Sequence, residues 1–418
     1  MKTRAKHLIR KTIIVNVFLV FILNCVCSQS IKTQYGCVIG DQFDDIYVNL
    51  EDDLVSVKKD GKWGFSDKAG KWIIQPLFDE VKCFVEDLAG TKKNQKWGFI
   101  DKTGQWVIEP QFDTVDYFSE GLAMVKKEEK WGSIDKTGQW VIEPQYDYVG
   151  DFSEGLLYVK KDGKWSGFID KTGRLIIEPQ FDAAGLRFSE GLVSVKKDEK
   201  WGFIDKTGQL VIEPQFSSAW DFKGGFAVAK INFGQWGFID KTGQWIIEPQ
   251  FDWVWSFKYG FAMVQKKGEY GFVNKTGQLV IEPRFDNACD CRGFEEGLKP
   301  VGIFRKWGVI DTTGRWVIKP QFDDVYGFSE GLAAAKKNGK WGVINTTGKW
   351  IIKPGFDEVD YFSKGIARVK KDGKWGLIDK TGRWIIEPLF DEVWHVKEGL
   401  AIVKKDGKWV FFSLFRQK

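Results

Sequence analysis

A stretch of about 34 residues is repeated along almost the whole chain of 418 residues, and this repetition restricts the fold more than any other feature. The copies align on one aromatic position, and a proline holds a second fixed position in ten of them. A constant period of this length indicates small units that stack on one another, not two or three independent domains. The aromatic positions are Trp63, Trp97, Trp131, Trp165, Trp201, Trp236, Tyr270, Trp307, Trp341, Trp375 and Trp409, and the prolines are Pro76, Pro110, Pro144, Pro179, Pro214, Pro249, Pro283, Pro320, Pro354 and Pro388.

The local pattern within each copy is that of β-strands. In "KWGFID", Trp97 and Phe99 alternate with Ile100, and in "QWVI" Val107 points away from its two large neighbours. Because both faces of these segments are apolar, we expect neighbouring units to cover them on both sides. The glycine after the tryptophan, such as Gly98, has no Cβ, and we expect an indole or backbone of the next unit to lie against it.

Turn residues separate these strands. "DKTG" places a glycine (Gly104, Gly138, Gly173, Gly208 and their equivalents) where a short hairpin needs a left-handed residue, and the aspartate can cap the turn. Pro110 is expected to end the following strand, because proline cannot donate to a β-ladder. "GLAMVKK" predicts a further strand, and "QFDTVDYF" predicts a fourth, shorter one. Each unit is therefore a small antiparallel sheet of three or four strands, too small to fold alone.

The two ends of the chain are complementary fragments of one unit. Residues 37–59 match residues 316–337, so the array begins late in one unit and ends, at "KWVFFSLF", early in another. Such ends suit a ring whose last blade contains both termini. Ten full units and a shared one make eleven, however, and propellers usually have four to eight blades. The sequence thus predicts an all-β tandem repeat of ten to eleven units, either propeller-like blades or an open superhelix, with the open superhelix or two unequal rings favoured.

The first 28 residues differ from the rest. A basic segment, an apolar segment and the small-residue stretch "VCSQS" predict a signal peptide cleaved before Gln29, with an uncleaved N-terminal anchor as the alternative. We expect a linker at 29–36, a partial unit at 37–62, ten repeats at 63–408 and a final strand at 409–418 that completes or caps the array. The signal holds five basic residues and no acid, so the remainder has 62 − 5 = 57 basic and 57 acidic residues. A neutral chain argues against nucleic-acid binding, and no membrane span is expected after cleavage.

Four cysteines lie beyond the signal. Export permits disulfides, and Cys37 with Cys83 is a candidate pair at the N-terminal edge. The spacing of Cys289 and Cys291 suits neither a zinc knuckle nor a C-x-x-C redox motif, so reduced or unusually paired loop thiols are expected there.

The motifs "KWGFIDKTG", "VIEPQFD" and "FSEGLA" resemble the WG-repeat family, also called KWG repeats, over residues 37–412. The resemblance implies a bacterial, often exported β-repeat protein that mediates interactions, and it supplies no catalytic residues. Several units depart from the pattern and are expected to be less regular: Tyr270 replaces Trp, Ser166 is inserted, Lys319 and Lys353 replace Glu, and the loop at 289–293 is enlarged.

The residue inventory offers little for catalysis. His395 is the only histidine outside the signal, which leaves no second histidine for a metal site or a catalytic triad. Glu109 and Asp113 have equivalents in many units, and a glycosidase needs two carboxylates, but a catalytic pair is normally unique. "DKTG" offers too few oxygen ligands for calcium. No enzyme, metal or cofactor is expected.

The positions that vary between copies are the better candidates for function. Of the 21 tryptophans, ten mark the first motif strand and seven the second, which leaves four in the variable segment after "FD". Repeat scaffolds bind through such segments, and exposed rings stack on sugars or anchor a protein partner. The alternative is that these rings only pack between units. The candidates are Trp220, Trp253, Trp255, Trp394, Tyr117, Tyr148, Tyr326 and Tyr361, with Trp253 and Trp255 on one face of one strand.

These observations predict an exported, non-catalytic scaffold that binds a protein partner or a cell-envelope glycan. A carboxylate-based carbohydrate-active enzyme and a purely structural surface spacer are the alternatives.

Overall fold

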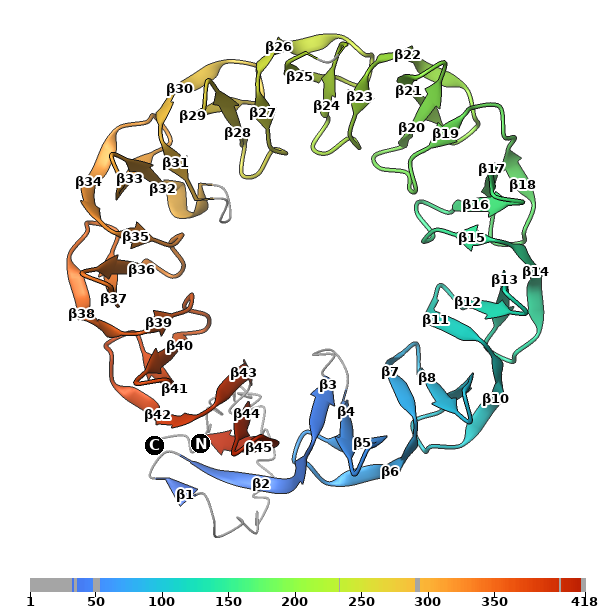
Figure 1. The fold of residues 1–418 in the computed structure, drawn as a ribbon, viewed down its shortest axis with the longest axis horizontal. Helices are drawn as coiled ribbons and strands as arrows, with labels where there is room; N and C mark the ends of the chain where they lie inside the picture. The colour runs from blue at the N-terminus through green and yellow to red at the C-terminus, as the bar shows by residue number, and fades with distance from the viewer. Residues whose placement is uncertain are drawn as a thin grey trace, which may run out of the picture.

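In a computed structural model, the chain forms a closed ring of eleven small β-sheets (Figure 1). It describes residues 32–33, 36–47, 53–232, 234–289, 294–397 and 400–414. Ten sheets have four strands in chain order and one has five. We call each sheet a blade. The predicted signal peptide at 1–28 lies outside the described residues.

Each blade contains strands of four kinds, which follow one another along the chain. The first strands are β3 (Asp45–Tyr47), β7 (Glu80–Val85), β11 (Thr114–Ser119), β15 (Tyr148–Val149), β19 (Ala183–Ala184), β23 (Ser218–Ala219), β27 (Trp253–Val254), β31 (Asn287–Ala288), β35 (Asp324–Val325), β39 (Glu358–Val359) and β43 (Glu392–Lys397). The second strands are β4 (Leu54–Lys59), β8 (Leu88–Lys93), β12 (Leu122–Lys127), β16 (Leu157–Lys161), β20 (Leu192–Lys197), β24 (Ala227–Lys230), β28 (Phe261–Lys266), β32 (Leu298–Ile303), β36 (Leu332–Lys337), β40 (Ile366–Lys371) and β44 (Leu400–Lys405).

The third strands carry the "KWGFID" motif, and the fourth carry "QWVIEPQF". The third strands are β5 (Lys62–Asp67), β9 (Lys96–Ile100), β13 (Lys130–Asp135), β17 (Lys164–Ile169), β21 (Lys200–Asp205), β25 (Trp236–Ile239), β29 (Glu269–Asn274), β33 (Lys306–Asp311), β37 (Lys340–Asn345), β41 (Lys374–Asp379) and β45 (Lys408–Leu414). The fourth strands are β6 (Trp72–Phe78), β10 (Trp106–Phe112), β14 (Trp140–Tyr146), β18 (Leu175–Ile177), β22 (Leu210–Phe216), β26 (Trp245–Phe251), β30 (Leu279–Phe285), β34 (Trp316–Phe322), β38 (Trp350–Phe356), β42 (Trp384–Phe390) and β2 (Gly36–Phe43).

Blades 1 to 10 follow the chain from β3–β6 to β39–β42. Blade 11 closes the ring and combines β43, β44 and β45 with β2 and the short β1 (Lys32–Thr33). One sequence repeat, counted from its tryptophan, supplies the third and fourth strands of one blade and the first and second strands of the next. Every blade boundary is therefore bridged by the middle of a repeat.

The closing contact is a β-ladder between the two ends of the array. β2 pairs antiparallel with β45, with Val38 opposite Phe412 and Phe43 opposite Trp409. This pairing confirms a propeller-like ring with a shared last blade, and the preference for an open superhelix or two rings is wrong. That preference relied on the usual range of four to eight blades. The number of blades in a ring depends on the angle between neighbouring blades, and the repeat motif does not limit it.

The predicted turn chemistry is confirmed in the "DKTG" hairpins. Gly104 has φ of +87°, and Asp101 Oδ1 accepts hydrogen bonds from Thr103 N at 2.8 Å and Gln105 N at 3.1 Å. A side chain at Gly104 would also press on Ile74 of the preceding blade, 3.0 Å from its Cγ2. The glycine thus serves both the turn and the blade contact.

The glycine after the tryptophan also permits a close approach, but not by the next unit as predicted. A Cβ on Gly98 would overlap the carbonyl oxygen of Ile108 and lie 2.7 Å from Pro110 N, both in the fourth strand of the same blade. The glycine therefore seats that strand on the third one.

Gly98→Ala is expected to lower the free energy of unfolding by about 1–3 kcal/mol, because the fourth strand must shift to admit the methyl group. Chemical denaturation measures this loss. The control is Gly355→Ala, since a Cβ at Gly355 would find its nearest atom at 3.9 Å. Equal effects of the two substitutions would contradict the packing role of Gly98.

The proline of the motif does not end its strand, and that prediction is wrong. β10 continues through Pro110 to Phe112, with an irregular register between Ile108 and Phe112. Proline is tolerated there because β10 is the last strand of its sheet and the ladder is already interrupted.

The expectation that both faces of "QWVI" are covered is also wrong. Val107 is 43% exposed, whereas Ile108 is buried. The fourth strands run along the outer perimeter of the ring, so no blade lies outside them (Figure 1).

Aromatic pairs join neighbouring blades. The tryptophan that begins a fourth strand packs edge-on against the "FD" phenylalanine of the preceding blade, for example Trp140 on Phe112 with ring centroids 5.7 Å apart. The same contact recurs for Phe43 with Trp72 at 5.3 Å and Phe322 with Trp350 at 5.4 Å. Edge-to-face pairs add to the free energy of burial, so these residues are the frame of the ring.

A second inter-blade contact involves the hairpins between first and second strands, whose loops point toward the centre of the ring (Figure 1). Glu154 accepts a hydrogen bond from Gly191 N of the next blade at 3.2 Å and pairs with Lys206 at 2.8 Å. Glu330 likewise binds Gly365 N at 3.0 Å and Lys380 at 2.8 Å. We call this glutamate, glycine and lysine set a hairpin clamp. Full clamps also centre on Glu86 and Glu190.

The cysteine predictions have mixed outcomes. Cys83 is a buried thiol, so the proposed Cys37–Cys83 disulfide is not formed. Cys289 is disulfide-bonded, and Cys291 lies outside the described residues. Two of the units expected to be irregular differ from the others: β18 is only three residues long in the blade with the Ser166 insertion, and the enlarged loop is followed by a 3-10 turn, η1 (Glu295–Gly297). The strands that contain Tyr270, Lys319 and Lys353 have the usual lengths, so the expectation is wrong for these units.

Candidate binding surface

The predicted site residues all lie in the first strand of a blade or directly after it. Trp253, Trp394, Tyr148 and Tyr117 are 42%, 47%, 42% and 37% exposed, so these rings are available to a ligand. Trp220, Trp255, Tyr326 and Tyr361 are half-buried. The segment therefore mixes accessible rings with rings that pack between blades.

The ring geometry brings some of these residues together and leaves others apart. Tyr326 stacks on Tyr361 of the next blade, with centroids 5.8 Å apart. Burial, the largest cause, raises the pKa of Tyr326, so its phenol stays neutral at physiological pH. Tyr117 lies under Lys82 of the preceding blade, 4.7 Å from the ammonium to the ring centroid.

Tyr148 and Trp394 touch only a ring of their own blade among the aromatic contacts of the described residues. Their partners are Tyr158 at 6.1 Å and Trp409 at 5.9 Å.

Blades 6 and 7 hold the largest gathering. Trp220 lies 5.3 Å from Trp236 and 5.8 Å from Trp253 of the next blade, measured between centroids. Trp253 lies 6.4 Å from Trp255, which in turn lies 5.8 Å from Tyr270. We call these five residues the aromatic cluster. Trp236 and Tyr270 belong to the repeated frame, and the other three come from the variable segment, so the cluster extends the frame to the surface.

A cavity of about 260 Å³ lies beside the aromatic cluster. Trp220 and Trp255 of the cluster line it, together with residues of blade 8. Three lysines also line it: Lys223, Lys258 and Lys299. These lysines are not among the predicted site residues, because they lie outside the variable segment directly after "FD". The signal was present, since Lys299 replaces an apolar residue that every other unit has, and Lys223 and Lys258 replace a serine that five units have.

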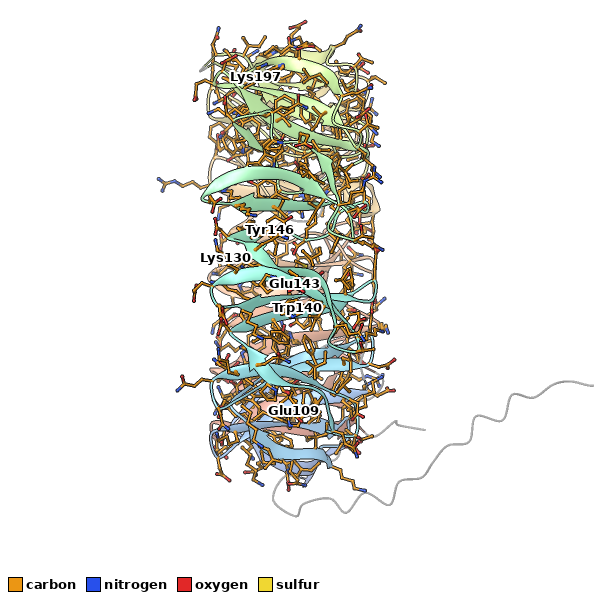
Figure 2. The ribbon with its side chains drawn as sticks, turned by 90° about the vertical axis from the view of Figure 1, so that its right-hand side faces the viewer. Glu109, Lys130, Trp140, Glu143, Tyr146 and Lys197 are labelled. Carbon is orange, nitrogen blue, oxygen red and sulfur yellow. The ribbon has the colours of Figure 1, made fainter. Side chains whose placement is uncertain are left out.

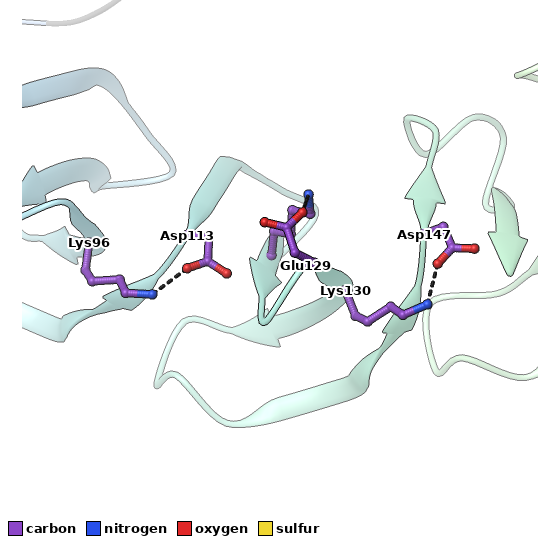
Figure 3. A network of polar contacts seen from close by, with 6 residues as sticks. Lys96, Asp113, Glu129, Lys130 and Asp147 are labelled. Carbon is purple, nitrogen blue, oxygen red and sulfur yellow. Dashed lines mark hydrogen bonds and ion pairs between the residues drawn. The ribbon is translucent and has the colours of Figure 1, made fainter. Parts of the chain in front are cut away.

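Aspartates of the "FD" motif form ion pairs between neighbouring blades. Asp113 pairs with Lys96 and Asp147 pairs with Lys130, each lysine belonging to the preceding blade (Figure 3). Asp147 Oδ2 also accepts a hydrogen bond from Gly163 N at 2.8 Å within its own blade. The lysine hydrogen bond lowers the pKa of Asp113, which keeps it ionised and suits an ion pair, not a proton donor.

The glutamates of the motif lie elsewhere. Glu109 and Glu143 are exposed on the outer wall of the ring (Figure 2). A glycosidase acid has a raised pKa and faces its partner carboxylate across the substrate. The position of Glu109 on the fourth strand and the ion pair of Asp113 do not form such an arrangement.

Within the described part of the chain, no group of three or more His, Cys, Asp or Glu residues could hold a metal ion. The same residues include no helix long and apolar enough to cross a membrane.

Eleven small antiparallel blades in a ring define a propeller-like β-repeat protein, a class typical of binding scaffolds. The family model described as WG containing repeat matches eleven consecutive stretches, and the chain belongs to this family. The matched residues are 42–63, 63–97, 97–131, 131–165, 167–201, 201–232, 236–270, 270–301, 307–341, 341–375 and 375–409.

The solved structures to which the chain is similar are distant. A eukaryotic initiation factor is 12% identical over 77% of this chain and 97% of its own, with a TM-score of 0.36. BamB from Moraxella catarrhalis is 12% identical over 64% and 96%, with a TM-score of 0.29. The extracellular domain of a one-component system from B. thetaiotaomicron is 12% identical over 90% and 65%, with a TM-score of 0.27. No curated protein matches the chain.

Proposed function

We propose that this protein is an exported, non-catalytic scaffold that binds a cell-envelope glycan through the aromatic cluster of blades 6 and 7. The observation that carries the proposal is the continuous contact from Trp220 through Trp253 and Trp255 to Tyr270, with Trp253 42% exposed beside a cavity. Flat, rigid rings offer sugar C–H faces a stacking surface at little cost in side-chain entropy. The N-terminal pattern at 1–28 supports export.

The carboxylate geometry supports a binding role over the enzymatic alternative. Asp323 joins its blade to the preceding one through Lys306, and the hydrogen bond from this lysine lowers the pKa of Asp323. Among the described residues, the lining of the cavity that would receive a substrate includes no Asp or Glu. Two positioned carboxylates are what glycoside hydrolysis needs.

Trp253→Ala is expected to weaken binding to envelope glycans about 10-fold or more, as for an exposed aromatic hot spot. Binding of the full chain to a purified envelope glycan fraction is measured by calorimetry, together with circular dichroism and the melting temperature.

The matched control is Trp394→Ala, which removes a ring of similar exposure from blade 11, away from the cluster. Equal losses for both substitutions would contradict a localised site. A lower melting temperature with unchanged binding would show that Trp253 serves packing. Capture of a protein and no glycan from envelope extracts would favour the protein-partner alternative.

A further inference from the structure

The cavity beside the aromatic cluster combines apolar walls with positive charge. Trp255, Phe272 and Phe294 line it together with Lys223, Lys258 and Lys299, and no carboxylate of the described residues does. Its volume of about 260 Å³ lies just below the roughly 300 to 1,000 Å³ typical of sites for drug-sized ligands, so it suits a single small ring.

Two of these lysines lie in hairpins that lack the clamp glutamate. Four inner hairpins contain a serine followed by a glutamate, as in Ser153 and Glu154, and the Ser153 hydroxyl donates to a carbonyl of the next blade. Blades 6 and 7 instead read "FKGG" and "FKYG", with Lys223 and Lys258 in the serine position. The exchange adds two positive charges and removes two negative ones at neighbouring hairpins. Within the described residues, neither lysine forms an ion pair.

The clamp lysine of blade 7 also faces a hairpin that lacks the clamp glutamate. In blades 5 and 6 the lysines of the "DKTG" turns, Lys206 and Lys241, pair with a glutamate of an earlier inner hairpin. Lys275 holds this place in blade 7, but the corresponding hairpin has Gly224, and the ammonium lies 3.6 Å from where a Cβ at Gly224 would be. A further ammonium therefore lies at the hairpin that contains Lys223, and among the described residues no glutamate occupies the clamp position there.

Lys299 is the strongest departure from the repeat. Its position in the second strand is Ala, Val or Leu in each of the ten other blades, and those residues form the core. Lys299 is only 3% exposed, and its ammonium lies 6.0 Å from the centroid of Phe272. Lys299 therefore brings a positive charge to the wall of the cavity at a position where every other blade has an apolar side chain.

We propose that this cavity binds one anionic sugar unit of a glycan, with the sugar ring against Trp255 and its acidic group held by Lys223, Lys258 and Lys299. The inference rests on the proposed glycan-binding function and adds the class of sugar. Aromatic walls accommodate the C–H face of the ring, and ammonium groups form charge-assisted hydrogen bonds to carboxylate or sulfate oxygens. Both acidic groups share this chemistry.

The experiment compares three probes on the full chain by calorimetry at low and moderate salt. They are trigalacturonate, a sulfated oligosaccharide of similar length, and the neutral methyl ester of trigalacturonate. We expect at least one acidic probe to bind more tightly than the neutral ester, and added salt to weaken its binding because the contact is ionic. The acidic probe that binds better identifies the acidic group.

The double variant Lys223→Gln/Lys258→Gln is expected to lose roughly 10-fold or more in affinity for the acidic probe, as for loss of hydrogen bonds to a charged group, with no change for the neutral ester. Both lysines are exposed, so the variant is expected to fold. Lys299→Met keeps the length of the side chain and removes the charge, and it should also lower the affinity for the acidic probe. The matched control is Lys364→Gln, an exposed lysine on the inner hairpin of blade 10, which should change nothing.

The outcomes separate the two proposals. Equal affinity for the neutral and acidic probes, with binding lost in Trp253→Ala, would overturn the anionic-sugar inference and leave the glycan-binding function standing. Unchanged affinity of the Lys223→Gln/Lys258→Gln variant for the acidic probe would also overturn the inference. Equally tight, lysine-dependent binding of polyglutamate would show that an acidic peptide is the ligand. Absence of binding to every glycan tested would contradict both proposals.

Discussion

Phe43→Ala is expected to open the ring. Phe43 is fully buried at the end of β2, opposite Trp409 in the closing ladder, and its ring contacts Trp72 at 5.3 Å and Phe411 at 6.0 Å. Removing a buried phenylalanine costs about 3–5 kcal/mol of stability. At this site the cost falls on the one blade whose sheet is assembled from the two ends of the array. Small-angle scattering should show a larger radius of gyration, and thermal unfolding should begin at a lower temperature.

Phe112→Ala separates ring opening from loss of packing. Phe112 holds the same motif position in blade 2, is 1% exposed and makes the same edge-on contact with Trp140. The chain is continuous through that blade, so the variant should lose similar stability without expanding. If both variants keep the radius of gyration of the parent, closure does not depend on the β2 contact. If both expand equally, blade 11 is no weaker than the others.

Acidification is expected to destabilise the ring as a whole. The lysine hydrogen bonds lower the pKa of Glu154 and of Glu330 in their hairpin clamps, with partial burial opposing them. A carboxyl group whose pKa is lowered on folding contributes stability above its unfolded pKa, and this stability is lost as the pH falls through the folded value. Glutamate titrates near pH 4, so the melting temperature should fall progressively below about pH 5. The clamps are partly exposed, and each contributes at most about 1 kcal/mol, but several are lost together.

Glu154→Gln tests whether the clamps cause this dependence. The amide keeps an acceptor for Gly191 N and loses the ion pair with Lys206, so the melting temperature should fall slightly at pH 7 and match the parent at pH 3. High salt at pH 7 should produce part of the same loss by screening the exposed pairs. A melting temperature that does not change between pH 7 and pH 3 would contradict a stabilising role for the clamps.

Much of the blade could be predicted from the sequence because its determinants are local. The positive φ of Gly104, the Asp101 cap and the alternation of Trp97, Phe99 and Ile100 all follow from interactions within a few residues. Closure could not be decided in this way. The ends of the array are complementary in sequence, but the angle between blades comes from many small contacts such as Trp140 on Phe112, and no single residue specifies it.

The two errors within the fourth strand have one cause. The expectations for Pro110 and Val107 hold only for a strand with neighbours on both sides, whereas this strand is the last of its sheet and faces outward. Edge position removes the need for a backbone donor at Pro110 and leaves Val107 without a covering unit.

The site was located only in part from the sequence. Trp253 and Trp255 could be selected because they interrupt a repeated pattern, and the structure adds the contact with Trp220 of the neighbouring blade. The distance between Lys299 and Phe272, and the cavity itself, depend on three blades meeting at one place. A comparison of all eleven copies at every position would have found Lys299, because no other copy has a charge there.

The offset between repeats and blades bears on how such a ring can change size in evolution. Since each repeat carries two strands of one blade and two of the next, an in-frame duplication or deletion of one repeat in the gene adds or removes a whole blade and leaves both junctions intact. The ladder between β2 and β45 involves only the two ends, so it is still available to close the new ring. Recombination between similar repeats in the gene would therefore change the circumference of the ring by whole blades.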